Sequence, residues 1–257
     1  MDLQLNGKTA LVTGATAGIG FAIAERLAAE GAQVTICGRN QQKLDAAAQR
    51  IGAHGILADP ATTEGAAALV KALPSVDILI NNLGIYESKP FAEITDDDWR
   101  RFYEVNVLSG ARLARAYFPG MMGRNWGRII FIASDSALIV PPDMIHYGMT
   151  KTAQLAMSRG LAAASKGTRV TVNSVLPGTT RSEGIADFLK SVAEDPQAPA
   201  EEIERAFFAR ERPTSLIQRM IEPEEIATLV AYVASPLSAA TNGAALRVDG
   251  GITPTIV

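Results

Sequence analysis

Short apolar runs alternate along this chain with longer stretches in which hydrophobic residues recur every three or four positions. The short runs have the length and β-branched composition of buried strands, whereas the longer stretches have the period of amphipathic helices. Strands that alternate with helices predict parallel βαβ units with right-handed crossovers and helices on both faces of one sheet. We therefore predict an α/β fold in one domain spanning residues 1–257, a doubly wound parallel sheet of about seven strands, at 8–13, 33–37, 55–58, 76–80, 128–133, 170–176 and 245–248.

Capping residues mark several helix ends. Thr95 precedes three aspartates, which is the pattern of an N-cap followed by an acidic first turn. Pro223 suits the first turn of another helix, which is expected to end near Ala234. The other helices are expected from Ile19 to just before Gly31 and at residues 41–51, 64–73, 96–117 and 144–165.

Residues 179–221 break the alternation and are expected to form a lid over the substrate. They contain two short helical patterns, at 183–192 and 200–212, separated by a proline-containing stretch. Phenylalanine and leucine side chains give these patterns apolar faces, and the alternative is that they simply pack on the body of the protein. These side chains are Phe188, Leu189, Phe207 and Phe208.

Composition narrows the class of protein. Of the 257 residues, 47% are hydrophobic and 20% are charged, and the net charge is −3. Because arginines and glutamates are interleaved between residues 201 and 219, no basic patch suits a nucleic acid. The single cysteine, Cys37, rules out an intrachain disulfide, so a reducing cytoplasm is the simplest setting. The apolar run that contains it favours a small buried side chain over a reactive thiol. The first residues lack a signal-peptide pattern and no apolar window approaches membrane-spanning length, so a cytoplasmic protein without a membrane segment is expected.

Three glycines, Gly14, Gly18 and Gly20, lie between the first strand and the first helix. A turn of this kind directs unpaired backbone N–H groups and the positive end of the helix dipole at one point, where a phosphate binds favourably. Glycines let the backbone approach that ligand, and the first βα unit is where a doubly wound fold binds its dinucleotide. The alternative is a glycine-rich connection that binds no nucleotide. A P-loop is excluded because no Gly-Lys-Ser/Thr follows.

Tyr147 and Lys151 are four residues apart in an expected helix and therefore share one face. An ammonium beside a phenol favours the phenolate, which would bring the pKa of about 10 toward the range useful for proton transfer near neutral pH. The same spacing is common on surface helices, so the pair alone does not establish catalysis.

Several motifs together resemble the short-chain dehydrogenase/reductase family, in the family's order and across essentially the whole chain. They are Thr13-Gly-Ala-Thr-Ala-Gly-Ile-Gly20, Asn81-Asn-Leu-Gly84, Asn106, Ser134, Tyr147-Gly-Met-Thr-Lys151 and Pro177-Gly178. The resemblance implies a single-domain Rossmann fold of about 250 residues. It also implies an NAD(P)(H)-dependent oxidoreductase that reduces a ketone or aldehyde, or oxidises the alcohol. Leu83 departs from the family, which usually has alanine there.

The resemblance implies a role for each residue of the site. Ser134 precedes Tyr147 by 13 residues, the usual separation in the family, which selects Ser134 over Ser136 as the catalytic serine. Tyr147 would exchange a proton with the substrate oxygen, Ser134 would hydrogen-bond that oxygen, and Lys151 would hold the nicotinamide ribose. Asn106 would hold a water that relays protons through Lys151; the alternative is a solvent-facing polar residue.

An asparagine inside a helix, as expected for Asn106, is unfavourable and can distort the helix.

The cofactor contacts implied by the resemblance, with no metal among them, are Gly14, Thr16, Ala17, Gly18, Ile19, Gly20, Arg39, Asn40, Asp59, Asn82, Gly84, Tyr147, Lys151, Pro177, Gly178, Thr180 and Ser182.

The end of the second strand predicts which nicotinamide cofactor binds. A carboxylate there accepts from a free ribose 2′-hydroxyl, whereas a cation accommodates a 2′-phosphate. This chain has Gly38 and Arg39 and no carboxylate, which favours NADP(H) over NAD(H). Ala17 lacks the second cation that some NADP-dependent relatives carry. The alternatives are a surface role for Arg39 and, for Asp59 before Pro60, a turn-forming role instead of contact with adenine.

The substrate is a small carbonyl compound or alcohol that the sequence does not specify; relatives act on 3-oxoacyl thioesters, sugars, steroids and other ketones. Contacts are expected from residues 85–95, 135–146 and 179–221. For His146, a packing or surface role is favoured over lining the pocket.

Three further hypotheses concern the whole protein. A catalytically silent nucleotide sensor or scaffold would need the glycine turn but not Tyr147 and its partners. Epimerases and dehydratases that use related hydride chemistry are usually longer. The resemblance suggests a homotetramer formed through the helices around 99–124 and 144–165, although apolar positions there do not distinguish an interface from a core.

Overall fold

A parallel sheet of seven strands forms the centre of the protein, in the order β3-β2-β1-β4-β5-β6-β7. The computed structural model describes residues 1–256 except 183–184, 186–188 and 191–192. Every neighbouring pair of strands is parallel, as the alternation of strands and helices predicts. The strands are β1 (Thr9–Thr13), β2 (Gln33–Gly38), β3 (His54–Leu57), β4 (Ile78–Asn81), β5 (Gly127–Ile132), β6 (Val170–Pro177) and β7 (Ala245–Val248).

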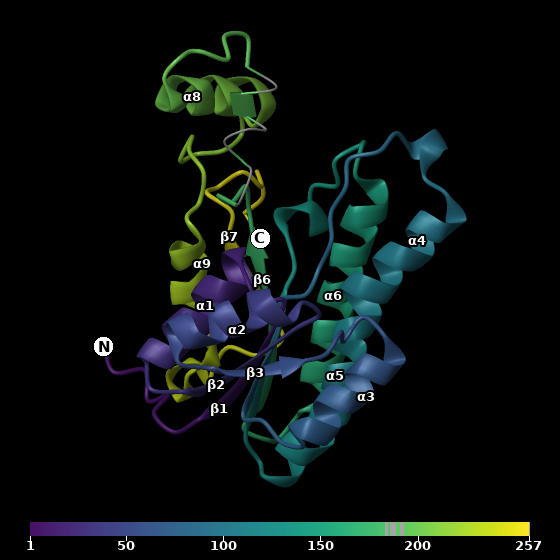
Figure 1. Ribbon diagram of the computed structural model, residues 1–257, viewed down its shortest axis with the longest axis vertical. Helices are drawn as coiled ribbons and strands as arrows, with labels where there is room; N and C mark the ends of the chain where they lie inside the picture. The colour runs from purple at the N-terminus through teal and green to yellow at the C-terminus, as the bar shows by residue number, and fades with distance from the viewer. Residues whose placement is uncertain (183–184, 186–188, 191–192, 257) are drawn as a thin grey trace.

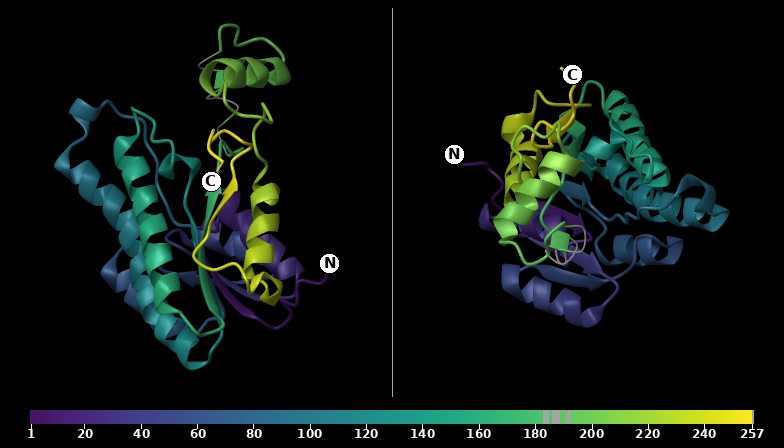
Figure 2. Two further views of the ribbon diagram at one scale, coloured as in Figure 1. Left: turned by 180° about the vertical axis from the view of Figure 1, so that it is seen from behind. Right: turned by 90° about the horizontal axis from the view of Figure 1, so that it is seen from above.

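Helices cover both faces of this sheet (Figures 1 and 2). One face carries α1 (Gly18–Ala29), α2 (Gln41–Ile51) and α9 (Pro223–Ala234), and the other carries α3 (Thr63–Ala72), α5 (Ser109–Gly123) and α6 (Ile145–Ala164). Because side chains alternate along a strand, each strand feeds two cores. Val12 and Ile80 belong to the first core, whereas Leu11 and Leu79 belong to the second.

The predicted helix ends are confirmed where a cap specifies them. Thr95 and Asp98 form a reciprocal capping box at the start of α4 (Asp96–Tyr103). Pro223 occupies the first turn of α9. The helix predicted from 96 to 117 is instead divided, because α4 runs into a π-helical segment, η2 (Glu104–Leu108), before α5 begins. Short 3₁₀ turns occur at η1 (Phe91–Glu93), η3 (Asp135–Ala137) and η4 (Pro236–Ser238).

The segment that follows β6 carries α8 (Ala200–Glu211) beyond the carboxyl edge of the sheet (Figure 1). Leu189, Phe207 and Phe208 pack with Ile203 and Met220 in a small apolar cluster of their own, so packing on the body is not their role. The helix predicted at 183–192 lies largely outside the described residues, as does Phe188. None of the described helices is long and apolar enough to span a bilayer.

Candidate active site

Apart from Tyr147 and Lys151 on α6, the residues predicted to bind cofactor follow the carboxyl ends of five strands. Because all strands are parallel, these ends meet at one edge of the sheet, where doubly wound folds bind ligands. The glycine turn follows β1, Arg39 and Asn40 follow β2, and Asp59 follows β3. Asn82 and Gly84 follow β4, while Pro177 ends β6 and is followed by Gly178, Thr180 and Ser182.

The glycine turn adopts a backbone that only glycine accommodates without strain. Gly14 has φ +62° and Gly18 has φ +57°, both in the left-handed region. A Cβ atom on Gly20 would lie 2.4 Å from the Gly14 carbonyl oxygen, so the third glycine permits α1 to pack against the end of β1. A Cβ atom on Gly18 would meet nothing within 4 Å, which leaves open space over the turn. This arrangement fits a dinucleotide phosphate at the start of α1.

Hydrogen bonds brace the turn against the end of β4. Asn82 Nδ2 donates to the carbonyls of Thr13 and Gly14 at 2.9 and 3.1 Å. Thr13 Oγ1 accepts from the backbone amides of Asn82 and Leu83, each at 3.0 Å. The side chain of Asn82 therefore fixes the shape of the phosphate-binding turn, and the backbone of Leu83, the residue that departs from the family, is held in place.

The end of β2 presents a cation to solvent. The Arg39 side chain is 85% exposed, and its guanidinium lies 4.0 Å from the Asp59 carboxylate. Asn40 caps α2, because its side-chain oxygen accepts from the Lys43 amide at 3.0 Å. Arg39 is thus free to turn toward an anion beside the first strand, whereas the amide oxygen of Asn40 is committed to the helix cap. Cys37, on the same strand, is buried, and burial raises the pKa of its thiol to about 12.

The π-helical segment places Asn106 in the buried centre of the edge. Its Oδ1 accepts from the Ile85 amide at 2.8 Å, and its Nδ2 donates to the Ile85 carbonyl and to Thr150 Oγ1, both at 3.0 Å. Asn106 is 1% exposed, so the alternative of a solvent-facing residue is wrong. Its amide joins the loop after β4 to α6, and its place in a π-helix agrees with the expected helix distortion. The relay water remains a prediction.

Lys151 lies next to Asn106 with its ammonium group buried. Nζ donates to the Ile132 carbonyl at 2.9 Å and stands 5.6 Å from the centre of the Tyr147 ring. Burial lowers the pKa of Lys151 to about 8. A Cβ atom on Gly84 would lie 3.4 Å from Nζ, so a glycine there keeps the space around the ammonium open.

Tyr147 is partly buried in the first turn of α6, and Tyr86 contacts its ring edge-on at 6.4 Å. Burial raises the pKa of the Tyr147 phenol to about 12; the Asp135 carboxylate adds to this effect and the Ser134 hydroxyl opposes it. The spacing to Lys151 predicts that the pKa of the Tyr147 phenol shifts toward neutrality. In the protein without cofactor this pKa is raised instead, so the prediction is wrong there. Burial has the largest effect on this pKa, so at neutral pH the phenol keeps its proton.

Ser134 follows β5 and is 7% exposed. Its Oγ donates to Asp135 Oδ1 at 2.8 Å and accepts from the Ser136 amide at 3.1 Å. Because Ser134 also influences the pKa of Tyr147, the structure brings the two predicted side chains together. Burial raises the pKa of Asp135, although the hydrogen bonds from Ser134 and Ser136 oppose this.

His146 is fully buried beside this site, so it packs and does not line the pocket. Its ring centre lies 4.1 Å from that of Phe102 and 6.1 Å from that of Trp99. Among the described residues neither ring nitrogen has a hydrogen-bond partner. Burial lowers the pKa of His146, although Glu87 and Asp98 oppose that shift.

We expect His146→Phe to remove a pH dependence of stability. Because the folded protein lowers the pKa of His146, the unfolded chain takes up the proton first, and wild-type stability falls as pH drops below about 6.5. As the pH falls from 7.5 to 5, the free energy of unfolding of the variant should therefore rise relative to that of the wild type, by up to about 1.4 kcal/mol per pH unit. Urea unfolding at several pH values measures this difference. Exposed His54→Gln is the control, and a pH-independent difference for His146→Phe would contradict the assignment.

The exit from β6 connects the site to the segment 179–221. A Cβ atom on Gly178 would lie 2.8 Å from the Asp249 carbonyl oxygen, so the two segments approach closely there. Thr180 Oγ1 donates to the Gly178 carbonyl at 2.9 Å. Arg181 pairs with Glu222 at 2.8 Å and with Glu204 of α8 at 3.0 Å, which ties the two ends of the segment 179–221 to α8.

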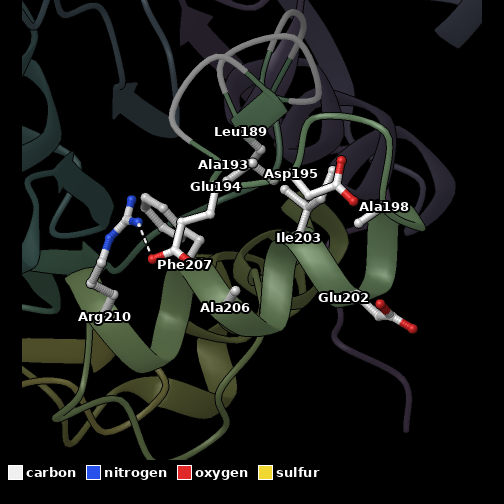
Figure 3. Close-up of a pocket in the computed structure, with 10 residues that line it drawn as sticks. All are labelled: Leu189, Ala193, Glu194, Asp195, Ala198, Glu202, Ile203, Ala206, Phe207 and Arg210. Atoms are coloured by element: carbon white, nitrogen blue, oxygen red, sulfur yellow. Dashed lines mark ion pairs between the residues drawn. The ribbon is translucent and has the colours of Figure 1, made fainter.

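Figure 3 shows a hollow lined by residues of the segment 179–221. Its volume is about 310 Å³, and all of its lining residues lie between Leu189 and Arg210. Ile203 and Phe207 supply apolar walls, and Arg210 pairs with Glu194 at 3.8 Å. None of the residues at the strand ends lines the hollow, so it is not the candidate active site.

Apolar side chains are exposed close to Tyr147 and Ser134. Tyr86 is 71% exposed while its ring contacts Tyr147, and the run Leu138, Ile139 and Val140 is exposed directly after η3. These residues belong to two of the segments expected to meet the substrate, so the surface around the site is partly apolar.

Two polar residues of the site were missed in the sequence. Asp135 accepts a hydrogen bond from the Ser134 hydroxyl, and Gln154 contacts both Asn106 and Lys151. The spacing of Gln154, three residues after Lys151 in an expected helix, puts both on one face and could have identified it. Nothing in the sequence marks Asp135 except its place beside Ser134. Among the described residues, no cluster of three or more His, Cys, Asp or Glu side chains could hold a metal ion.

Comparison with known proteins agrees with this geometry. Residues 8–192 match the family described as short chain dehydrogenase. The chain is 49% identical to an uncharacterized oxidoreductase of Bacillus subtilis (strain 168), YvaG, over the full length of both. It is 33% identical to the 3-oxoacyl-[acyl-carrier-protein] reductase of Escherichia coli (strain K12), covering 97% of this chain and 99% of that protein. The L-sorbose reductase of Gluconobacter frateurii, solved with NADPH and L-sorbose, superposes over 100% of both chains with a TM-score of 0.92 and 30% identity.

Proposed function

Since the chain belongs to the short-chain dehydrogenase/reductase family and is thus an oxidoreductase of the nicotinamide-dinucleotide type, we propose that it is an NADP(H)-preferring carbonyl reductase with Tyr147 as general acid. In the opposite direction the same site would oxidise the alcohol. The observation that carries the proposal is the meeting of Ser134, Tyr147 and Lys151 at the carboxyl edge of the sheet, beside the glycine turn.

Each residue contributes a distinct step to the reduction. The glycine turn and Lys151 would hold a nicotinamide dinucleotide, which would supply a hydride for the carbonyl carbon. Tyr147 gives its phenolic proton to the carbonyl oxygen, and its pKa of about 12 keeps that proton in place at neutral pH. Ser134 binds the same oxygen and orients it. The Lys151 ammonium holds the nicotinamide ribose and stabilises the phenolate that forms.

A silent sensor or scaffold is the less favoured alternative. Such a protein needs the glycine turn to hold a dinucleotide, but it gains nothing from burying an ammonium beside a phenol. Keeping Lys151 at 4% exposure, with no carboxylate partner in the part of the chain that the structure describes, costs stability. A protein that retains this arrangement is better explained by chemistry at Tyr147.

Arg39 is the basis for the preference for NADP(H). Its guanidinium is exposed at the end of β2, and a charge-assisted bond to a 2′-phosphate contributes about 1.5–3 kcal/mol. Arg39→Asp should therefore lower the ratio of kcat/KM for NADPH to that for NADH by roughly 10- to 100-fold. Arg100→Asp, the same charge change on exposed α4, is the control. An unchanged ratio in Arg39→Asp would count against the cofactor assignment.

The substrate class is tested with a panel of carbonyls and alcohols followed at 340 nm with both cofactors. The panel should contain 3-oxoacyl thioesters, because a 33% identical relative is a 3-oxoacyl-[acyl-carrier-protein] reductase. It should also contain ketoses, because of the similarity to L-sorbose reductase. We expect turnover of at least one carbonyl compound with NADPH. No turnover of any compound, with dinucleotide binding intact, would favour the sensor.

A homo-oligomer, with a tetramer as the expected form, completes the proposal. A shallow groove between α5 and α6 is lined by Ala111, Ala114, Arg115, Phe118, Pro119, Met157 and Leu161. An apolar surface of this kind on the two helices is what an interface between copies would cover. The cytoplasmic location expected from the single cysteine belongs to the same proposal.

A further inference from the structure

The Gln154 carboxamide joins two functional residues of the site. Its Nε2 donates to the Asn106 carbonyl at 2.5 Å, and its Oε1 faces Lys151 Nζ at 3.5 Å. Gln154 is 2% exposed, so these contacts form without competing water. Lys151 is three residues earlier on α6, which places both side chains on one face of the helix.

The chemistry of the two partners requires a carboxamide. The Lys151 ammonium only donates hydrogen bonds and the Asn106 carbonyl only accepts them. A group placed between them must offer one acceptor and one donor, as a glutamine side chain does. A carboxylate would meet the Asn106 carbonyl with a second acceptor, and an aliphatic side chain would satisfy neither partner.

The π-helical turn makes the Asn106 carbonyl available. In η2 the backbone amide of Ser109 bonds to the Glu104 carbonyl, one residue farther back than in an α-helix. The shifted hydrogen bonds leave a carbonyl directed toward α6, and Gln154 takes it up. The side-chain amide of Asn106 is already bonded to Ile85 and Thr150. Gln154 therefore links Asn106 and Lys151 directly, the two residues between which the family resemblance implies a relay through water.

We propose that Gln154 is a positioning residue that holds the Lys151 ammonium in register with Asn106 and stabilises its charge. This inference rests on the proposed function for its role in the reaction. The carboxamide does not titrate near neutral pH, so it acts by placing Lys151 and not by transferring a proton. Its oxygen dipole favours the protonated amine across 3.5 Å of buried interior.

The pKa of Lys151 is set by its burial and by the groups around it. Burial is the only resolved cause of the lowered pKa of Lys151. Among the described residues, none of the ion pairs includes Lys151. Titratable groups occur near Tyr147 and on the elements packed against α6. They are Tyr86, Asp96, Asp97, Asp98, Arg100, Arg101, Tyr103, Glu104, Arg128, Asp135, His146 and Tyr147.

Titration of Lys151 in the free, full-length protein tests the proposal without a substrate. Lysine labelled with ¹³C and ¹⁵N reports the midpoint by NMR, and Lys151→Met assigns the signal. Gln154→Leu should lower the midpoint from about 8 by roughly 0.5–1 pH unit, because a hydrogen bond to the charged form is lost. Gln154→Glu should raise it by about 1–3 pH units, because a carboxylate then lies within ion-pair distance.

Kinetic measurements connect this titration to the reaction. With the carbonyl compound that the panel identifies, Gln154→Leu should lower kcat about two- to fivefold at pH 8, because a midpoint lowered by 0.5–1 pH unit removes that share of the protonated Lys151, and less at pH 6.5, where Lys151 is again protonated. The KM for that compound should change little. Ser158→Ala is the control, since Ser158 is a buried residue one turn farther along α6 and its hydroxyl has no hydrogen-bond partner among the described residues.

The outcomes are separable. If the Leu and Glu variants titrate Lys151 at the wild-type midpoint, the proposal for Gln154 is overturned whatever the panel shows. If the midpoints move in opposite directions but no carbonyl turns over, the proposed function fails and the link to Lys151 stands. Should the Leu variant not fold, the wild-type protein still decides, because the Gln154 side-chain amide signal must shift with the midpoint of Lys151.

Discussion

Replacing Tyr147 by Phe should lower turnover by at least about 10²-fold, the usual contribution of a positioned general acid. The substitution removes one hydroxyl group and keeps the ring that contacts Tyr86. The pKa of about 12 means that the wild-type phenol is protonated throughout the neutral range, so the loss should be nearly independent of pH between about 6 and 8. The measurement is kcat for NADPH oxidation with the best carbonyl from the panel.

The loss should appear in kcat while dinucleotide binding persists. The glycine turn and Arg39 are unchanged in Tyr147→Phe, so the NADPH dissociation constant should stay within a few-fold of wild type. Tyr232→Phe, which removes a hydroxyl from α9 on the opposite face of the sheet, is the matched control. Near-normal kcat in Tyr147→Phe would remove Tyr147 from the proposed mechanism.

Gly20→Ala should damage both stability and cofactor use. The added Cβ would lie 2.4 Å from the Gly14 carbonyl oxygen and 2.4 Å from Asn82 Nδ2, and neither atom belongs to a side chain that can swing freely away. Overpacking of this kind costs about 1–3 kcal/mol in the free energy of unfolding. Displacing the turn by a fraction of an ångström should also lower kcat/KM for NADPH by up to about 10²-fold.

The exposed helical residue Gly160 provides the control for this change. A Cβ atom there would meet nothing within 4 Å, so Gly160→Ala should be neutral or stabilise the protein by about 0.5–1 kcal/mol. Chemical unfolding and NADPH kinetics on both variants measure the contrast. If Gly20→Ala matched Gly160→Ala in both properties, close packing at the glycine turn would not matter for the site.

The sequence predicts those parts of the fold that local chemistry determines. The apolar runs locate all seven strands, and the alternation with helices predicts their parallel arrangement. Thr95 with Asp98, and Pro223, mark their helix starts because a cap acts over only three or four residues. The glycine turn could be located for the same reason, since its conformation is restricted by its own residues.

Contacts between distant segments could not be predicted in this way. The π-helical turn depends on Asn106 meeting Ile85 and Thr150, which are 21 and 44 residues away. The pKa of Tyr147 depends on how deeply α6 is buried, and a helical spacing contains no information about desolvation. His146 is buried between Phe102 and Trp99 because α4 crosses α6, a contact that neither helix specifies alone.

Hydride transfer from the dinucleotide to a carbonyl carbon, with Tyr147 supplying the proton, is the central claim. The most direct test incubates the wild-type protein with NADPH deuterated at nicotinamide C4, separately in each of its two configurations, and the best carbonyl from the panel. Mass spectrometry of the alcohol then locates the label. The account predicts deuterium on the former carbonyl carbon with one configuration of the cofactor and none with the other. An unlabelled alcohol with both would contradict it.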